Sequence, residues 1–334
     1  MRRRILLAAL VIGLLVTAGA SALTIKLGSL APVGSPWETA ARRMAAEWER
    51  ISGGSVTVKL YAGGIAGDEP DMIRKMRIGT LNGALITVTG LQNIFNGVKT
   101  LSYPLLLRND AELSYVLDRM KPFFSQEIQS RGFQPVMWAP SGWVYFFSRA
   151  PVVAPADLKK EKLWVWSGDP DEVQAYQAAG FQTVSVAATD LMTSLQGGMV
   201  DALVTSPLVA ASSQWFGIAG NMTQMKLAPL WGAGVVSMKT WSQVPADLQP
   251  KLLDAAQKVA DSLAPDLQKA DSQAIDVMLK YGLKISPVPA ATATQWADLL
   301  QKTFAPLVGR TYDRQSFDMV TQYLAEYRKA HPGE

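Results

Sequence analysis

The sequence predicts an α/β fold built on a doubly wound, largely parallel sheet. Strand-like runs alternate with helix-forming segments from residue 23 onward, which is the pattern of such a layer. The run 83–88 is almost entirely apolar, as expected for a strand buried inside a parallel sheet. With 49% hydrophobic and 18% charged residues, the chain has a globular composition, and its 334 residues suffice for two domains.

The first part of the chain supplies strands and helices in turn. Residues 23–28 alternate between apolar and polar side chains, which predicts a half-buried strand. Ser35 and Pro36 are typical of an N-cap and a first helical position, and apolar residues at helical spacing follow as far as Trp48. The other elements predicted here are a strand over 56–61, a helix over 69–78 and the strand over 83–88.

A second α/β block follows, and a helix-rich region comes after it. The aromatic run 143–147 predicts a strand that crosses between the two blocks. Residues 246–281 are dominated by good helix formers, so they predict one long helix or two helices that meet near Pro265. The remaining elements are strands over 162–166, 181–186 and 200–205, and helices that begin after Asp169 and at Asp190.

The N-terminus has the pattern of a secretory signal peptide. Three arginines precede an apolar run over 5–18, and the small residues up to Ala22 fit a cleavage site after that residue. An uncleaved membrane anchor is the alternative, but the run is short for a span of about 20 residues. Cleavage removes three positive charges and leaves a nearly neutral chain, which has no electrostatic basis for binding nucleic acid.

The residues that most enzymes and metal sites need are scarce. The single histidine, His331, is close to the C-terminus, and there are no cysteines. This argues against zinc sites, Ser-His-Asp machinery, thiolate nucleophiles and disulfides. The available acids, Asp169 and Asp171 among them, stand where helix capping explains them, and no nucleophile–base pair is visible. We therefore expect a protein that is not an enzyme and that has no cofactor and no metal.

The glycine turn that joins strand 56–61 to the next helix does not predict a phosphate site. It lacks both GxGxxG and GxxxxGK[ST], and the helix begins Asp68-Glu69-Pro70-Asp71, which places carboxylates where a phosphate would sit. We expect these acids to cap the helix, with Glu69 also able to face a ligand.

Seven segments, in order, resemble the DctP-type substrate-binding subunit of tripartite ATP-independent periplasmic (TRAP) transporters. They are LG…PW at 27–37, SGG at 52–54, AGGIAGDE at 62–69, IGTLNGA at 78–84, LSYPLLL at 101–107, ADLK at 156–159 and LQGGMVD at 195–201. The resemblance implies two α/β domains joined by crossing strands, with a ligand cleft between them and a long helix along both.

The same resemblance implies a function in the periplasm. A small organic ligand would be captured in the cleft and delivered to the membrane subunits of a TRAP permease, which is driven by an ion gradient. The implied domains are residues 23–144 with part of 232–334, and residues 145–231. A sensing or scavenging binding protein without a permease remains the alternative.

Departures from the family pattern bear on the ligand. Trp164 stands where family members usually carry a carboxylate-binding arginine, and Val144 stands at a second frequent arginine position. Arg149 is the nearest other basic residue, and we expect it to point to solvent. The chain therefore resembles a divergent branch that lacks the binding arginine, and it predicts an apolar, aromatic or weakly charged ligand. The residues expected to contact it are Trp164, Trp166, Tyr145, Glu69, Thr89, Ser206, Trp231 and Trp37, although several of the aromatic ones could belong to the core.

Overall fold

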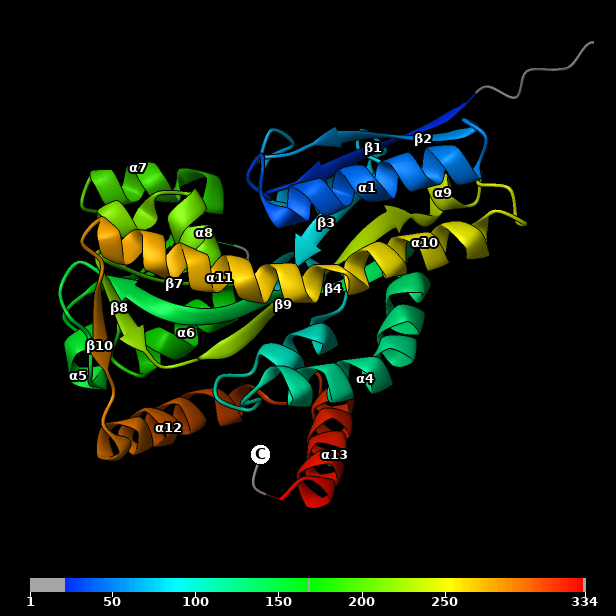
Figure 1. The fold of residues 1–334 in the computed structure, drawn as a ribbon. Coiled ribbons are helices and arrows are strands. Elements are labelled where there is room, and N and C mark those ends of the chain that lie inside the picture. Colours follow the sequence, from blue (N-terminus) through cyan, green and yellow to red (C-terminus); the bar gives the residue numbers. More distant parts are fainter. Residues whose placement is uncertain (1–21, 168, 333–334) are drawn as a thin grey trace, which may run out of the picture.

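The protein is described by a computed structural model that covers residues 22–167 and 169–332 (Figure 1). The predicted signal segment, Ala22 excepted, lies outside the described residues. The described strands form one sheet in the order β2-β1-β3-β9-β4-β7-β5-β6, to which β8 is added beside β4 and β10 beside β8. They are β1 (Leu23–Ser29), β2 (Val56–Tyr61), β3 (Gly83–Thr87), β4 (Phe133–Ser148), β5 (Lys162–Trp166), β6 (Gln182–Val186), β7 (Ala202–Thr205), β8 (Asn221–Gln224), β9 (Ala228–Ser237) and β10 (Lys284–Pro287).

The long strand β4 connects two lobes. Its first part pairs antiparallel with β9, which continues through β3 to the parallel strands β1 and β2. Its last four residues pair with β7 and β8, and β7 leads to the parallel strands β5 and β6. We call the β1–β2–β3 side the first lobe and the β5–β6–β7 side the second lobe. The α/β fold is confirmed, as is the predicted strand over 143–147, whereas the proposed division after residues 144 and 231 stays a prediction.

Helices cover both faces of the sheet (Figure 1). The longer ones are α1 (Pro36–Ile51), α2 (Glu69–Arg77), α4 (Asp110–Ser130), α6 (Pro170–Ala178), α10 (Gln249–Asp261), α11 (Leu263–Lys280), α12 (Ala290–Phe304) and α13 (Arg314–Ala330). The shorter ones are α3 (Val88–Leu91), α5 (Pro155–Leu158), α7 (Leu191–Gln196), α8 (Pro207–Ser212) and α9 (Met238–Trp241), with 3₁₀ turns η1 (Asn96–Ser102), η2 (Ala188–Asp190), η3 (Trp215–Gly217) and η4 (Ala305–Leu307).

The helical region predicted over 246–281 consists of two helices, α10 and α11, rather than one. The break falls at Ser262, and Pro265 lies in the first turn of α11, where a missing backbone N–H costs nothing. Together α10 and α11 run along both lobes (Figure 1). Leu267 near the start of α11 packs in the core of the first lobe, and Met278 near its end packs in the core of the second. The long helix implied by the family resemblance is thus found as two consecutive helices, α10 and α11, that meet at Ser262.

Acidic and hydroxyl side chains begin the helices that border the space between the lobes. Ser35 accepts a hydrogen bond from the Glu38 backbone N–H at the start of α1, and Asp68 does the same for Glu69 at the start of α2. Asp169 caps α6 by accepting from the Glu172 backbone N–H. These caps agree with the sequence prediction. Over the described ranges, no helix combines the length and hydrophobicity needed to cross a membrane.

Candidate ligand-binding site

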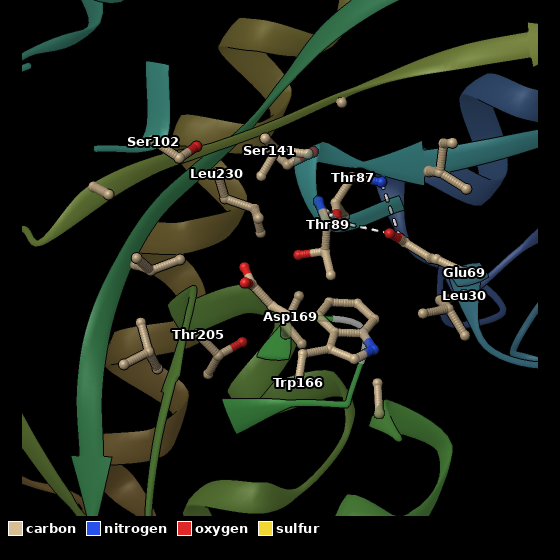
Figure 2. A pocket seen from close by; sticks show the side chains of 18 of the residues that line it. Leu30, Glu69, Thr87, Thr89, Ser102, Ser141, Trp166, Asp169, Thr205 and Leu230 are labelled. Atoms are coloured by element: carbon tan, nitrogen blue, oxygen red, sulfur yellow. Dashed lines mark hydrogen bonds between the residues drawn. The ribbon is translucent and has the colours of Figure 1, made fainter. Parts of the chain in front are cut away.

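A cavity of about 580 Å³ lies between the two lobes. This size falls within the roughly 300–1,000 Å³ that is usual for small-molecule sites. Figure 2 shows Glu69, Thr87 and Thr89 of the first lobe on one side of the cavity, and Trp166, Asp169 and Thr205 of the second lobe on the other. Most of the other lining side chains are apolar, and they come from both lobes and from the connecting strands β4 and β9.

Five of the eight residues expected to contact a ligand line this cavity, and three do not. The five are Trp164, Trp166, Glu69, Thr89 and Trp37. Ser206 is fully buried and caps α8 by accepting from the Val209 backbone N–H. Tyr145 is half-buried and packs against core side chains of both lobes. Contact of any of the eight with a ligand stays a prediction.

Trp231 belongs to the core instead of the cavity wall, and strand geometry explains why. Its neighbours in β9, Leu230 and Gly232, both line the cavity. Because successive side chains of a strand point to opposite faces, Trp231 points away from it. The indole stacks on Phe124 and Trp138, with ring centroids 6.0 and 5.9 Å away, and its N–H donates to the Ser102 hydroxyl.

Trp164 and Trp166 lie side by side in the second-lobe wall, as their spacing in β5 predicts. Their ring centroids are 5.7 Å apart, and Trp215 extends the group at 6.3 Å from Trp164. The indole N–H of Trp164 donates to the Val186 carbonyl at 3.0 Å. This donor is therefore engaged within the protein, and what Trp164 offers the cavity is apolar surface.

Glu69 is a buried carboxyl group at the first-lobe side of the cavity. It accepts hydrogen bonds from the Thr87 backbone N–H at 2.9 Å, the Thr87 hydroxyl at 2.9 Å and the Gly90 backbone N–H at 2.7 Å. Burial raises the pKa of Glu69 to about 7, even though these hydrogen bonds favour the charged form. Glu69 thus holds β3 and α3 together at the cavity edge.

A buried ion pair that the sequence reasoning missed lies in the same cavity. Lys99, from η1 on the first lobe, donates to the Asp169 carboxylate and lies 3.5 Å from Oε2 of Glu172, both on the second lobe. Burial disfavours the ammonium, but the two carboxylates outweigh it and raise the pKa of Lys99. No local pattern could have paired Lys99 with residues about 70 positions away; the available signal was a lysine in an otherwise uncharged segment.

The two acids of this group differ in their ionisation. Burial would raise the pKa of Asp169, yet the neighbouring Lys99 lowers it below its usual range. Burial raises the pKa of Glu172 to about 7, although Lys99 acts in the opposite direction. The side chain of Glu172 is 29% exposed and lines the cavity. Lys99 is consequently neutralised by Asp169, and Glu172 adds negative charge at higher pH.

No arginine is found among the described residues that line the cavity, and Lys99 is their only basic side chain. Arg149 is outside the lining set; it pairs with Asp201 at 3.1 Å and donates to the Leu195 carbonyl, with its side chain 38% exposed. Within the described ranges no group of three His, Cys, Asp or Glu side chains could hold a metal ion. The cavity offers apolar surface, scattered hydroxyls and a neutralised lysine.

Two lobes joined by crossing strands around a cavity define a solute-binding protein. A family model described as bacterial extracellular solute-binding protein, family 7 (DctP) matches residues 27–310, so the chain belongs to this family. Its members are periplasmic solute-binding components of TRAP transporters and are not enzymes. This confirms two expectations from the sequence: the resemblance to DctP-type solute-binding proteins and the absence of an enzymatic function.

Curated relatives and solved structures agree with this assignment. Solute-binding protein RD1_1052 of Roseobacter denitrificans is 26% identical over 71% of this chain and 73% of its own length. The 2,3-diketo-L-gulonate-binding periplasmic protein YiaO of Escherichia coli is 22% identical over 77% and 75%. A TRAP periplasmic solute-binding protein from Desulfovibrio salexigens, solved with bound orotic acid, is 20% identical with a TM-score of 0.84, over 92% of this chain and 99% of that one.

Proposed function

We propose that this protein captures an apolar, aromatic or weakly charged organic ligand in the cavity between its lobes and delivers it to a TRAP-type permease. It would then belong to a branch of the family that has lost the carboxylate-binding arginine. The observation that carries the ligand class is the charge of the cavity wall. Lys99, the basic side chain among its described residues, is already paired with Asp169 and flanked by Glu172.

An anionic ligand would meet an unfavourable site here. A charge-assisted hydrogen bond contributes roughly 1.5–3 kcal/mol, so the loss of an arginine clamp weakens carboxylate binding about ten- to a hundredfold. To replace the clamp, Lys99 would have to leave a buried carboxylate, which would then be unpaired. Burial of a ligand against Trp164 and Trp166 supplies binding energy from apolar area instead.

This proposal sets the chain apart from proteins of the same fold. The solved structures named for D. salexigens and R. denitrificans hold orotic acid and L-galactonate, which are organic acids. Those proteins are only 20% and 21% identical to this chain, so their ligands do not carry over. They do supply the probes for a test.

Titration calorimetry tests the ligand class. The protein is purified without refolding, any co-purified compound is identified by native mass spectrometry, and that compound is compared with L-galactonate, D-glucuronate, orotate and C4-dicarboxylates. We expect an uncharged or apolar compound to bind at least about tenfold more tightly than any of the acids. Submicromolar binding of a small dicarboxylate or sugar acid would overturn the proposal.

Trp164→Arg sharpens this test, because it puts a charge into the apolar, largely buried part of the cavity wall at the position where we expect the family's arginine. Binding of the apolar compound should weaken by about tenfold or more. Ser185→Arg is the matched control: it adds the same charge at an exposed position on the neighbouring strand β6, outside the cavity lining. Unchanged affinity in Trp164→Arg would contradict a ligand seated on this indole.

Export and delivery have separate tests. Cleavage after Ala22 predicts a periplasmic chain that begins at Leu23, which an intact-mass measurement checks. Genes for a small and a large membrane subunit beside this one would support delivery to a permease. A sensor-kinase gene in their place would support the sensing or scavenging alternative.

A further inference from the structure

The described part of the cavity wall carries more acidic than basic groups. Lys99 is the basic side chain among its described residues, and it donates to one of the acids. Asp68 adds a carboxylate next to the wall, because it accepts a hydrogen bond from the indole N–H of the lining residue Trp166 at 2.7 Å. Four carboxyl groups thus stand against one ammonium. The three that line the wall are Glu69, Asp169 and Glu172.

We infer that the ligand of this cavity carries a single positive charge on an apolar frame, as an organic ammonium does, and that this charge is held near Glu172. The inference rests on the proposed function, because it names the kind of weakly charged ligand that the same cavity would take. Acidic groups alone would define no site. Here they border a cavity whose wall includes indole rings, and the face of an indole attracts a cation.

Glu172 is the lining acid that has capacity left for a ligand. Its side chain is 29% exposed, whereas Glu69 and Asp169 are only 1% and 5% exposed. Both oxygens of Glu69 accept hydrogen bonds from its own lobe, and Asp169 accepts from Lys99 and caps α6. The contact of Glu172 is looser, with Oε2 at 3.5 Å from the Lys99 ammonium. A ligand cation at Glu172 would therefore not have to displace Lys99.

Indole rings supply the other half of the site. The N–H groups of Trp164 and Trp166 both donate within the protein, to the Val186 carbonyl and to Asp68. What the two rings offer a ligand is therefore apolar surface and the negative face of the π system. Figure 2 shows Trp166 and Asp169 pointing into the same space from the second lobe. An organic ammonium in this space would meet ring surface and carboxylates together.

The arrangement fits an organic cation better than a metal ion. Within the described ranges no three His, Cys, Asp or Glu side chains are grouped so that they could hold a metal. A hard metal cation needs several oxygen ligands at about 2.0–2.6 Å. A substituted ammonium spreads its charge over a larger volume, so carboxylates and rings at different sides of a cavity can stabilise it together.

The ionisation of Glu172 provides a second signature of a cationic ligand. Burial raises the pKa of Glu172 to about 7, with Asp169 adding to the rise and Lys99 opposing it. The other titratable groups that interact with it are Tyr176 in α6 and Tyr312 just before α13. Burial raises the pKa of both phenols well above the usual value, so they stay neutral. Glu172 therefore gains negative charge as the pH rises through about 7, and the affinity for a cation should rise with it.

Three compounds on one aromatic frame test the inference. They are 2-phenylethylammonium, 2-phenylethanol and phenylacetate, which are cationic, neutral and anionic, and an alkyl amine of this kind stays protonated at pH 8, as lysine does. Each is titrated calorimetrically at pH 8 into protein that has been dialysed free of co-purified compounds. We expect the ammonium to bind at least about tenfold more tightly than the alcohol, the scale of a desolvated cation–π contact, and phenylacetate to bind most weakly.

Glu172→Gln removes the charge and keeps the shape of the side chain. It should lower the affinity for the ammonium by about tenfold and change that for the alcohol by less than about twofold. It should also reduce the rise in ammonium affinity between pH 5.5 and pH 8. Asp190→Asn is the matched control, since it removes an exposed acid of the same lobe that lies outside the cavity lining, and it should reproduce the parent.

The outcomes separate this inference from the proposed function. If the ammonium binds no more tightly than the alcohol, the inference is overturned while the proposed ligand class stands. Tightest binding of phenylacetate would overturn both. An equal loss of ammonium affinity in Glu172→Gln and Asp190→Asn would show a long-range effect of charge and contradict the place assigned to Glu172.

Discussion

Two groups of aromatic side chains show how similar residues reach different fates in this molecule. The core tryptophan cluster consists of Trp138 and Trp231 with Phe124; the cavity tryptophan cluster consists of Trp164, Trp166 and Trp215. The two clusters differ little in burial: Trp138 and Trp231 are 6% and 0% exposed, and Trp164 and Trp215 are 8% and 9% exposed. The difference is that protein side chains cover the first cluster, whereas the second forms part of a cavity wall.

The comparison teaches that aromatic density indicates where binding energy can come from, but strand geometry decides which rings are available. Met137 and Ala139 alternate with Trp138 along β4, and both line the cavity. Trp138 therefore faces the opposite side of the sheet, where α4 supplies Phe124. Trp164 and Trp166 of the cavity cluster belong to β5 and Trp215 belongs to η3, and all three line the cavity.

The largest expected effect comes from Trp231→Ala in the core cluster. Removal of a fully buried indole leaves a cavity that its stacked neighbours cannot fill, which lowers the free energy of unfolding by about 3–5 kcal/mol. Urea denaturation measures this loss. Ligand affinity of the folded fraction should stay within about twofold of the parent, a scale set by small free-energy differences. A large loss of affinity at unchanged stability would place Trp231 in the site and break the comparison.

Much of the fold was predictable because its signals are local. The apolar run of β3, the caps Ser35 and Asp68, and the shared face of Trp164 and Trp166 each depend on neighbouring residues. The interlobe contacts were not predictable from such patterns. Asp68 and Trp166 are 98 residues apart, and Lys99 and Asp169 are 70 apart, so their meeting is fixed only by how β4 and β9 cross between the lobes.

The same limit applies to the predicted contact of Trp231. Trp231 is suggested as a ligand contact only because it is aromatic, and the partners that bury it, Phe124 and Trp138, are distant in the sequence. Ser206 is instead an N-cap, for which the following Pro207 was an available local signal. The break at Ser262 is a smaller instance. Pro265 predicts a junction near that point but does not fix its position, because a proline is tolerated throughout the first turn of a helix.

A second prediction concerns pH, since the cavity cluster lies next to ionisable groups. The pKa of Glu172 is raised from 4.5 to about 7, chiefly by burial, with Asp169 adding to the rise and Lys99 opposing it. The folded protein therefore binds more protons than the unfolded chain between these values. The corresponding stability is fully present below about pH 4.5 and is lost as the pH rises through about 7.

Urea denaturation at pH 5 and pH 8 tests this sign. The free energy of unfolding should be lower at pH 8, and Glu172→Gln should reduce the difference by about 1–3 kcal/mol, because a shift of one pKa unit is worth about 1.4 kcal/mol. Part of the stability difference between pH 5 and pH 8 should remain in Glu172→Gln, because burial also raises the pKa of Glu69 to about 7. Trp231→Ala should lower stability equally at both pH values. A parent that is more stable at pH 8 would contradict the assignment.

The smallest expected effect comes from exchanging one tryptophan for phenylalanine in each cluster, in two separate variants. Trp215→Phe removes part of a ring that packs on Trp164 on one side and borders the cavity on another, so few protein contacts are lost. We expect a decrease in unfolding free energy below about 1.5 kcal/mol, the scale of tolerated apolar exchanges. Trp138→Phe is the matched change in the core cluster, where the indole packs between Phe124 and Trp231, and it should cost more. The two variants should also differ in binding, since only Trp215→Phe enlarges the cavity and changes the affinity of an apolar ligand. Equal costs and equal affinities would mean that the two clusters are packed alike, and the distinction between core and cavity wall would fail.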